Sequence, residues 1–380
     1  MRSVDPLACA LSRPSVLVVT ERGDRPETGL FIALHRAGVR VKVLGWADSP
    51  YAAWLADAGV LFEPLVLLGK RDRSGIESIR WHIDDFRPDI LHLMRKRAIF
   101  NGLAAAKGRS VRIVLYRGIV GNISMMNPLD WMSFLNPRVD RIVCVAEAVR
   151  QRFLELGIGP LRIPPEKLVT IYKGHDLGWY RAAPLDLATV GVPRGAFVVT
   201  CAAQVRPRKG IPVLIRAMAH LPSSLPIHVV LVGGGMTSPA LARLIRRSPY
   251  RDRFHVLGFR DDAPQILAAS DVSVLPSLRR EGLPRAVIES MAYGTPVIVS
   301  DAGGNPELVE HERSGLVVPA GDAEALGAAI LRLYVDREFR AELGRNARRR
   351  IATSFTVERT AAETLAMYEE LLSSSGLSFA

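Results

Sequence analysis

EGLPRAVIESMAYGTPVIVS, residues 281–300, has the pattern of a loop, a helix, a turn and a buried strand in succession. Pro284 suits the first turn of a helix, where the missing N–H of proline is no loss. Apolar residues follow at helical spacing over residues 286–292, and Gly294 occupies the position of a left-handed C-terminal cap. The run Val-Ile-Val at 297–299 then predicts a strand in the interior of a sheet.

The same alternation of strands and helices extends over the whole chain. Residues 15–44 read as a strand, a helix and a second strand, and this order requires a parallel sheet. Asp24 and Glu27 have the spacing of a capping box at the start of that helix. Further buried strands are predicted at residues 90–93, 111–116, 141–145, 168–172, 197–202, 227–232, 255–257, 272–275 and 315–318.

The 380 residues are enough for two domains, and an irregular stretch with two prolines at 174–195 separates two α/β series. We therefore predict an α/β fold of two doubly wound, Rossmann-like domains that face a central cleft. The first domain is placed at residues 1–180 and the second at residues 190–355. Ligands of such sheets bind at the carboxyl ends of the strands, so the cleft is the expected site.

The composition favours an anionic partner and indicates neither a metal nor a disulfide framework. With a formal net charge of +12, the protein could bind nucleic acid, an acidic membrane surface or a phosphorylated ligand. Nucleic acid is the weakest of these, because we find no recognised nucleic-acid-binding module. Cys9, Cys144 and Cys201 are odd in number and widely spaced, which fits a reducing cytoplasm. We expect no secretory signal and no membrane span.

Glu281 and Glu289 flank the predicted start of the helix in the opening stretch. Free N–H groups around Pro284 make this helix start a natural anion site. Carboxylates accept strong hydrogen bonds from sugar hydroxyls, so the pair indicates a ligand with both phosphate and hydroxyl groups. The alternatives are two solvated acids, or a metal site for which no His or Asp cluster completes the ligand set.

Three further segments follow predicted strands of the second domain, where a parallel sheet binds its ligands. The segment QVRPRKG, residues 204–210, contains Arg206 and Lys209, which can neutralise a diphosphate. The glycine runs at 233–235 and 303–304 allow the backbone to approach a ligand closely. Each segment alone is explained nearly as well by a solvated basic turn or a tight turn, but their coincidence favours one binding site.

These motifs resemble the donor-binding core of the retaining glycosyltransferases of family 4. The resemblance is carried by DVSVLPSLRREGLPRAVIESMAYGTPVIVSDAGGNPELVEHERSGLVVPAGDAEAL, residues 271–326, in which Glu281 and Glu289 stand at the family's E-x7-E signature. It covers most of the range from residue 197 to about residue 355 and is highly specific there. In the first half the resemblance is looser and rests on ETGLFIALHRAGVRVKVL, RPDILHL, DRIVCVAEAVRQRFLELGI and KLVTIYKGHD.

The resemblance implies a GT-B architecture and a site for a nucleotide-diphospho-sugar, which is a co-substrate rather than a cofactor. Glu289 would bind the ribose hydroxyls, Glu281 would face the transferred sugar, and Lys209 would bind the diphosphate. The final helix, within residues 356–380, would pack back onto the first domain. Retention of anomeric configuration without a metal is also implied. The other donor-side candidates are Gln204, Arg206, Gly234, Gly235, Gly282, Leu283 and Pro284.

The sequence departs from the family pattern at two positions that bear on catalysis. The arginine that usually precedes the lysine of the basic segment is replaced by Gln204, and Arg206 or Arg208 would substitute for it. Many relatives place a His or Asp near the reacting sugar where this chain has Arg117. Arg117 is therefore the candidate catalytic group of the first domain.

The first domain is expected to bind a glycan or lipid-linked acceptor in cell-surface polysaccharide synthesis, including that of lipopolysaccharide. Its basic clusters and the apolar residues of PLDWMSFLNPR, 128–138, predict peripheral contact with an anionic membrane at the inner face of the cell membrane. The alternative is a packed short helix beside a solvated basic face, and liposome flotation would distinguish the two. Rival functions are a nucleotide-sugar epimerase and a catalytically weak relative that only binds nucleotide-sugars.

Overall fold

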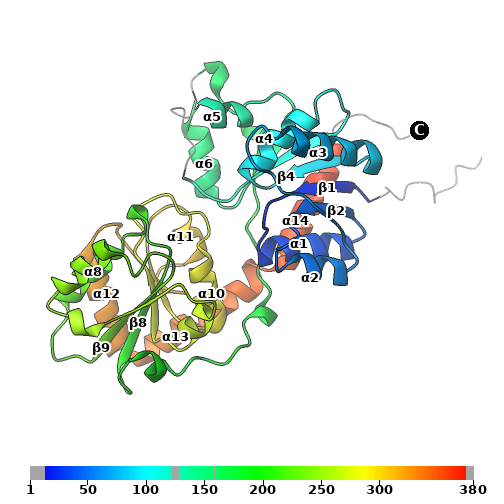
Figure 1. The fold of residues 1–380 in the computed structure, drawn as a ribbon. Helices are drawn as coiled ribbons and strands as arrows, with labels where there is room; N and C mark the ends of the chain where they lie inside the picture. Colours follow the sequence, from blue (N-terminus) through cyan, green and yellow to red (C-terminus); the bar gives the residue numbers. More distant parts are fainter. Residues whose placement is uncertain (1–12, 122–127, 158, 374–380) are drawn as a thin grey trace, which may run out of the picture.

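Two parallel sheets form the framework of the protein (Figure 1). The structure is a computed structural model that describes residues 13–121, 128–157 and 159–373. The first sheet has seven strands in the order β3-β2-β1-β4-β5-β6-β7, and the second has six in the order β10-β9-β8-β11-β12-β13. In each sheet the order reverses beside the first strand, which confirms the predicted doubly wound α/β fold.

The strands agree closely with the hydrophobic runs of the sequence, because strands buried on both faces are continuously apolar. The strands of the first sheet are β1 (Ser15–Val19), β2 (Arg40–Gly45), β3 (Leu61–Pro64), β4 (Ile90–Leu93), β5 (Arg112–Arg117), β6 (Val139–Cys144) and β7 (Leu168–Thr170). Those of the second sheet are β8 (Phe197–Ala202), β9 (Ile227–Val232), β10 (Phe254–Gly258), β11 (Val272–Leu275), β12 (Val297–Ser300) and β13 (Leu316–Val318).

Helices cover both faces of each sheet (Figure 1). In the first half they are α1 (Arg25–Arg36), α2 (Ala52–Asp57), α3 (Arg73–Phe86), α4 (Lys96–Ala105), α5 (Pro128–Phe134) and α6 (Glu147–Glu155). In the second half they are α7 (Ile211–Ala217), α8 (Pro239–Arg246), α9 (Ala263–Ala268), α10 (Arg285–Tyr293), α11 (Asn305–Leu308), α12 (Ala323–Val335), α13 (Arg337–Ser354) and α14 (Val357–Ser373). Short 3-10 turns lie at Gly159–Leu161, Pro165–Lys167, Leu177–Trp179, Leu187–Val190, Pro207–Lys209, Met218–His220 and Arg251–Arg253.

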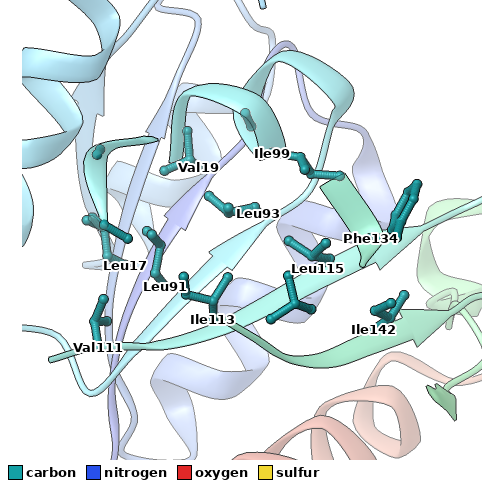
Figure 2. Close-up of a cluster of buried hydrophobic side chains, with 14 of the residues drawn as sticks. Leu17, Val19, Leu91, Leu93, Ile99, Val111, Ile113, Leu115, Phe134 and Ile142 are labelled. Atoms are coloured by element: carbon teal, nitrogen blue, oxygen red, sulfur yellow. The ribbon is translucent and has the colours of Figure 1, made fainter. Parts of the chain in front are cut away.

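The first sheet separates two apolar layers. Leu17 and Val19 of β1 belong to the layer shown in Figure 2, whereas Val16 and Val18 belong to the layer on the opposite face. Successive side chains of a strand point to opposite faces, so a strand whose residues are all buried must be covered on both sides. This rigid double layer fixes the loops that leave the carboxyl ends of β1, β4 and β5.

The last helix, α14, packs on the first domain beside α1 (Figure 1). Met367, Tyr368 and Leu371 of α14 join the apolar layer that contains Val16 and Val18. The hydroxyl of Tyr368 lies 2.6 Å from Nδ1 of the buried His92 on β4. The chain therefore crosses twice between its two halves, once after β7 and once before α14.

Two local expectations need correction. Pro284 does not lie within the first helical turn, because it has extended backbone angles and forms the N-cap of α10, which begins at Arg285. Trp131 and Phe134 do not form a membrane-facing patch, because both are buried and their rings pack against Phe153. Met132 of that segment is exposed, at 56 %.

Cys144 and Cys201 are buried and free within the two sheets, whereas Cys9 lies outside the described residues. Among the residues that the structure describes, no helix is both long and apolar enough to cross a membrane. In the same ranges, no three His, Cys, Asp or Glu side chains are arranged to hold a metal ion.

Candidate functional site

Glu281 lies at the centre of a buried polar cluster beyond the carboxyl end of β11. It is only 4 % exposed, and its Oε1 atom accepts a hydrogen bond of 2.7 Å from the hydroxyl of Ser277. The same oxygen lies 2.9 Å from Nζ of Lys209 and 3.1 Å from Nη1 of Arg208. The predicted sugar-facing carboxylate and diphosphate-binding lysine are thus in direct contact.

A close approach of two loops holds this cluster together. Gly210 has a φ of 65°, and a Cβ atom there would lie 1.8 Å from the carbonyl oxygen of Pro276. The N–H of Leu278 also donates to the carbonyl of Arg208, at 2.7 Å. Only glycine accommodates both the left-handed backbone and this approach. Gly210 therefore allows Lys209 to lie against the loop that carries Glu281.

The structure brings Arg208, and not Arg206, to Glu281. Arg206 is exposed, and its Nε atom donates to the side-chain oxygen of Gln204 at 2.9 Å. The sequence left both arginines open as substitutes for the missing family arginine. Of the two alternatives that the Gln204 departure left open, the structure places Arg208 at the site, although Arg206 was the one chosen as a site candidate.

The glycine run after β9 packs against the same basic segment. A Cβ atom at Gly233 would lie 2.1 Å from the carbonyl oxygen of Ala203, and the N–H of Val205 donates to the carbonyl of Gly234 at 2.8 Å. Gly235, with a φ of 81°, lies against the side chain of Val205. Close backbone approach, which the sequence predicted toward a ligand, is observed here between two loops of the protein. Gln204, Gly234 and Gly235 form one corner of the candidate donor site.

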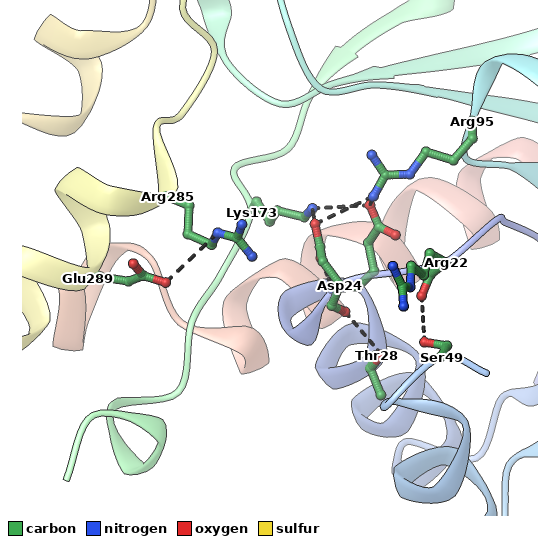
Figure 3. Close-up of polar contacts among 9 residues, drawn as sticks. Arg22, Asp24, Thr28, Ser49, Arg95, Lys173, Arg285 and Glu289 are labelled. Atoms are coloured by element: carbon green, nitrogen blue, oxygen red, sulfur yellow. Dashed lines mark hydrogen bonds and ion pairs between the residues drawn. The ribbon is translucent and has the colours of Figure 1, made fainter. Parts of the chain in front are cut away.

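Glu289 occupies the second turn of α10, and its side chain is 17 % exposed. Its Oε1 atom lies 3.9 Å from Nε of Arg285, which is a loose contact (Figure 3). Burial raises the pKa of Glu289 to about 7, although Arg285 and Arg25 act in the opposite direction. A carboxylate that is costly to ionise and held by no tight ion pair is suited to accept hydrogen bonds from an incoming ligand.

This pKa shift predicts how stability depends on pH. In the unfolded chain Glu289 ionises near 4.5, whereas in the folded protein it does so near 7. The folded state therefore binds more protons between these values, and stability falls as pH rises through that window. Glu289→Gln removes this loss, so we expect the variant to be more stable than the wild type by about 3 kcal/mol at pH 8 and equally stable at pH 4. Urea denaturation at both pH values measures the difference.

The matched control is Glu342→Gln, which changes an exposed glutamate on α13. It should leave the pH dependence of unfolding as it is in the wild type. If Glu289→Gln and the wild type lost stability in parallel between pH 4 and pH 8, burial of an ionisable Glu289 would be ruled out.

The loop before α10 meets the first domain directly. A Cβ atom at Gly282 would lie 2.5 Å from the carbonyl oxygen of Gly118, and one at Gly304 would lie 3.0 Å from the side chain of Ala146. Leu283 packs against the apolar layer of the first domain shown in Figure 2. The candidate donor loops are therefore in contact with the carboxyl ends of β5 and β6.

Glu307 strengthens this contact by capping a helix of the other domain. Its two carboxylate oxygens accept hydrogen bonds of 2.6 and 2.7 Å from the N–H groups of Glu147 and Ala148, at the start of α6. The N-cap residue of α6 is Ala146, whose side chain cannot supply this cap. An acid at the positive end of a helix is favourable, so the pairing stabilises the arrangement of the two domains. Sequence reasoning could not predict this role of Glu307, because its partners lie 160 and 159 positions away.

A partly buried ion-pair cluster occupies the first domain opposite Arg285 (Figure 3). Nζ of Lys173 lies 2.7 Å from Asp24 and 3.2 Å from Glu27, which is 1 % exposed. Arg95 lies 2.5 Å from Glu27 and 3.5 Å from Asp24. Burial alone would raise the pKa of Asp24, but Lys173 and Arg95 lower it to about 2. Asp24 is therefore ionised at neutral pH, and the two cations hold both carboxylates.

Arg117 lies at the end of β5, next to this cluster. Its guanidinium donates to the carbonyls of Ile119, at 3.0 Å, and Gly121. Neighbouring Tyr116 is a poor proton donor or acceptor, because burial raises its pKa to about 12. The candidate catalytic position of the first domain is thus a permanently charged cation and not a proton-transfer group.

These groups surround a cavity of about 560 Å³ between the domains. The first domain contributes Asp24, Arg95, Arg117 and Lys173 to its wall, and the second contributes Leu283 and Arg285. Of the sequence-based candidates, Arg117 and Leu283 therefore meet at one cavity. Asp24, Arg95 and Lys173 were not among the candidates, because their association depends on residues up to 149 positions apart.

Two family models match the chain, one for each half. "Glycosyl transferases group 1" matches residues 186–350, and "Glycosyltransferase Family 4" matches residues 29–179. The chain belongs to the family-4 glycosyltransferases. This confirms the resemblance drawn from residues 271–326.

Individual relatives of this family-4 chain agree with the assignment. The UDP-Gal:alpha-D-GlcNAc-diphosphoundecaprenol alpha-1,3-galactosyltransferase of Escherichia coli is 31 % identical over 225 residues, which are 57 % of each chain. The lipopolysaccharide core biosynthesis glycosyltransferase LpsD of Rhizobium meliloti (strain 1021) is 26 % identical over 343 residues, 89 % of this chain and 92 % of LpsD. The matches with the first three curated relatives span 63 %, 57 % and 51 % of those relatives' own length.

A solved structure confirms the GT-B fold of this family-4 chain. Anabaena Alr3699/HepE, in complex with UDP and glucose, superimposes with a TM-score of 0.77 at 23 % identity. The match covers 93 % of this chain and 100 % of HepE. At this level of identity the likeness establishes the fold alone.

Proposed function

We propose that this protein transfers a sugar from a nucleotide-diphospho-sugar to a hydroxyl group of a glycan or lipid-linked acceptor in cell-surface polysaccharide synthesis. The observation that carries the proposal is the buried contact of Glu281 with Lys209 and Arg208, in a loop that meets the first domain. The names of the relatives, a galactosyltransferase acting on a diphosphoundecaprenol-linked sugar and a lipopolysaccharide core glycosyltransferase, support the same class of reaction.

In the proposed reaction the bond between the anomeric carbon and the diphosphate oxygen breaks, and a bond to the acceptor oxygen forms on the same face. The proton of the acceptor hydroxyl passes to the departing nucleoside diphosphate, so no side chain has to remove it. Lys209, with Arg208 beside it, would neutralise the charge that develops on the diphosphate, without a metal. Glu289 would accept hydrogen bonds from the ribose, and Glu281 would orient the transferred sugar.

Gly282 and Pro284 would present backbone to the sugar and diphosphate, while Gln204, Arg206, Gly234 and Gly235 would border the nucleotide. Arg117 would act from the first domain as a fixed positive charge. UDP is the first nucleotide to examine, because HepE is known in complex with UDP and glucose. Peripheral contact with an anionic membrane remains part of the proposal, now without Trp131 and Phe134.

The function is tested by thermal unfolding with a panel of UDP- and GDP-sugars, followed by product analysis. A donor at about 100 times its Kd should stabilise the protein by about 2.7 kcal/mol. Nuclear magnetic resonance of the product should show the anomeric configuration of the donor, and EDTA should leave the rate unchanged. Epimerised nucleotide-sugar formed without any acceptor would overturn the proposal in favour of an epimerase.

A further inference from the structure

The glycine pair at 303–304, for which the sequence predicted close approach to a ligand, packs against the loop that carries Glu281. A Cβ atom at Gly303 would lie 2.3 Å from the carbonyl oxygen of Glu281, and one at Gly304 would lie 2.3 Å from that of Gly282. The N–H of Gly304 also donates to the carbonyl of Glu281, at 3.2 Å. Because a side chain at either glycine would collide with the backbone of this loop, the pair fixes the start of α11 to the loop of Glu281.

The backbone of α11 is also tied to the rest of the second domain. Arg350 of α13 donates from Nη2 to the carbonyl of Glu307 and from Nε to that of Leu308, both at 2.7 Å. The side-chain amide of the buried Asn305 donates to the carbonyl of Ser300, at the end of β12, at 2.9 Å. The side chain of Glu307 therefore projects from a rigid support.

This side chain binds the first domain at the start of α6. Its carboxylate accepts from the N–H groups of Glu147 and Ala148. The carboxylate of Glu147 is itself engaged elsewhere, since it accepts a hydrogen bond of 2.7 Å from the hydroxyl of Thr170. Tyr172, just after β7, also lies close, because burial and then the carboxylate of Glu307 raise the pKa of Tyr172 to about 12. Glu307 is therefore held between α6 and the end of β7.

The start of α6 leads directly to the candidate catalytic position of the first domain. Val145 lines the cavity between the domains, and its N–H donates to the carbonyl of Arg117 at 3.0 Å. Glu147, which Glu307 binds, follows two residues later. A continuous series of contacts thus runs from Glu281 through the glycine pair and Glu307 to the backbone of Arg117.

The cap of α6 exists only while the two domains have this arrangement. A helix is preferentially capped by the side chain of its own N-cap residue, but the N-cap of α6 is Ala146. If the domains moved apart, α6 would lose both its hydrogen-bonded cap and the negative charge at its positive end. The contact therefore favours the arrangement in which the loop of Glu281 meets the first domain.

We propose that Glu307 is a positioning residue for sugar transfer, which holds the first domain and Arg117 in register with Glu281. It acts through the arrangement of the domains and not by contact with the reacting groups. The inference rests on the proposed function, in which both domains contribute to the reaction. A displacement of about 1 Å between reacting groups can lower a rate about 100-fold, so a fixed register of the domains controls turnover.

The test compares Glu307→Ala with the wild type, both as the full-length protein. Small-angle X-ray scattering should show a larger radius of gyration for the variant, with and without UDP. Calorimetric titration should give the same UDP affinity, because the backbone contacts of α11 with the loop of Glu281 remain. The kcat for transfer from the donor identified by thermal unfolding should fall about 100-fold, with the KM for that donor unchanged.

Two further variants separate domain positioning from helix stability. Asp336→Ala removes a cap within the second domain, where Oδ1 of Asp336 accepts from the N–H of Phe339 at 2.9 Å. This variant should lower Tm but change neither the radius of gyration nor kcat. Ala146→Ser, added to Glu307→Ala, gives α6 a cap of its own and should recover Tm but not kcat.

A wild-type kcat or a wild-type radius of gyration in Glu307→Ala would overturn the inference and leave the proposed function intact. Recovery of kcat together with Tm on adding Ala146→Ser would also overturn it, because Glu307 would then act only by stabilising α6. If the wild type bound no nucleotide-sugar, the proposed function would fail, whereas the scattering comparison without UDP would still decide whether Glu307 holds the domains together.

Discussion

Replacing Lys209 by alanine should lower the rate of sugar transfer by about 100- to 1,000-fold, the usual effect of removing one preorganised group that stabilises transition-state charge. Lys209 is only 13 % exposed and is held 2.9 Å from Glu281. Gly210 fixes it there, so the ammonium does not have to be reorganised when the diphosphate leaves. The measurement is kcat for transfer from the donor identified by thermal unfolding.

Variants of the two neighbouring arginines provide a further test of this prediction. Arg208 contacts Glu281 and Arg206 does not, so Arg208→Ala should reduce the rate more than Arg206→Ala. Lys107→Ala, far from the donor loops in sequence and in an exposed turn, should leave the rate unchanged. Wild-type turnover in Lys209→Ala, with the fold intact by circular dichroism, would falsify the assignment of the diphosphate site.

The framework of the fold was predictable because its strands are almost all buried on both faces. Val16 to Val19 are fully buried, and a short, continuous apolar run of this kind is typical of a strand in the interior of a sheet. The prediction omitted β3, an edge strand whose residues are largely exposed, so that no apolar run marks it. It also omitted three helices of the first domain: α2, in which Leu55 is the buried residue, and the longer helices α3 and α4.

The candidate site was predictable where its residues follow neighbouring strands of one parallel sheet. Lys209 follows β8 and Glu281 follows β11, and the carboxyl ends of these paired strands meet at one edge of the sheet. The cluster of the first domain was not predictable in this way. Asp24 does cap α1, with the N–H of Glu27 at 3.0 Å, as the capping-box spacing predicts. The carboxylate of Glu27, however, turns to Arg95 and Lys173 instead of to the helix end.

Replacing Lys173 by methionine should destabilise the protein by about 3–5 kcal/mol, because it leaves the buried Glu27 and the partly buried Asp24 with one cation fewer. Lys173 is 19 % exposed and contacts both Asp24 and Glu27. Burial opposes its charged form, yet Glu27 and Asp24 raise the pKa of Lys173 above its ordinary value. Urea denaturation at pH 7 measures the loss of free energy.

The surface pair of Arg13 and Glu369 provides the matched control. It has a similar separation of 2.6 Å, but both side chains are about half exposed. Solvent screens such a pair, so Arg13→Met should cost less than about 1 kcal/mol. A loss as small as this for Lys173→Met would show that the cluster of the first domain does not stabilise the fold.

The pH dependence of unfolding identifies which carboxylate accounts for the stability lost in Lys173→Met. The pKa of Asp24 is about 2 in the folded protein and 3.8 without its partners, so its stabilising contribution is complete above pH 4 and is lost as pH falls toward 2. Lys173→Met should therefore differ from the wild type most at pH 7 and least near pH 2. Adding Asp24→Asn to Lys173→Met removes the uncompensated charge and should recover part of the lost stability at pH 7. Unchanged stability on adding Asp24→Asn would place the uncompensated charge on Glu27 instead, whose Oε2 atom is buried without a hydrogen-bond partner among the described residues.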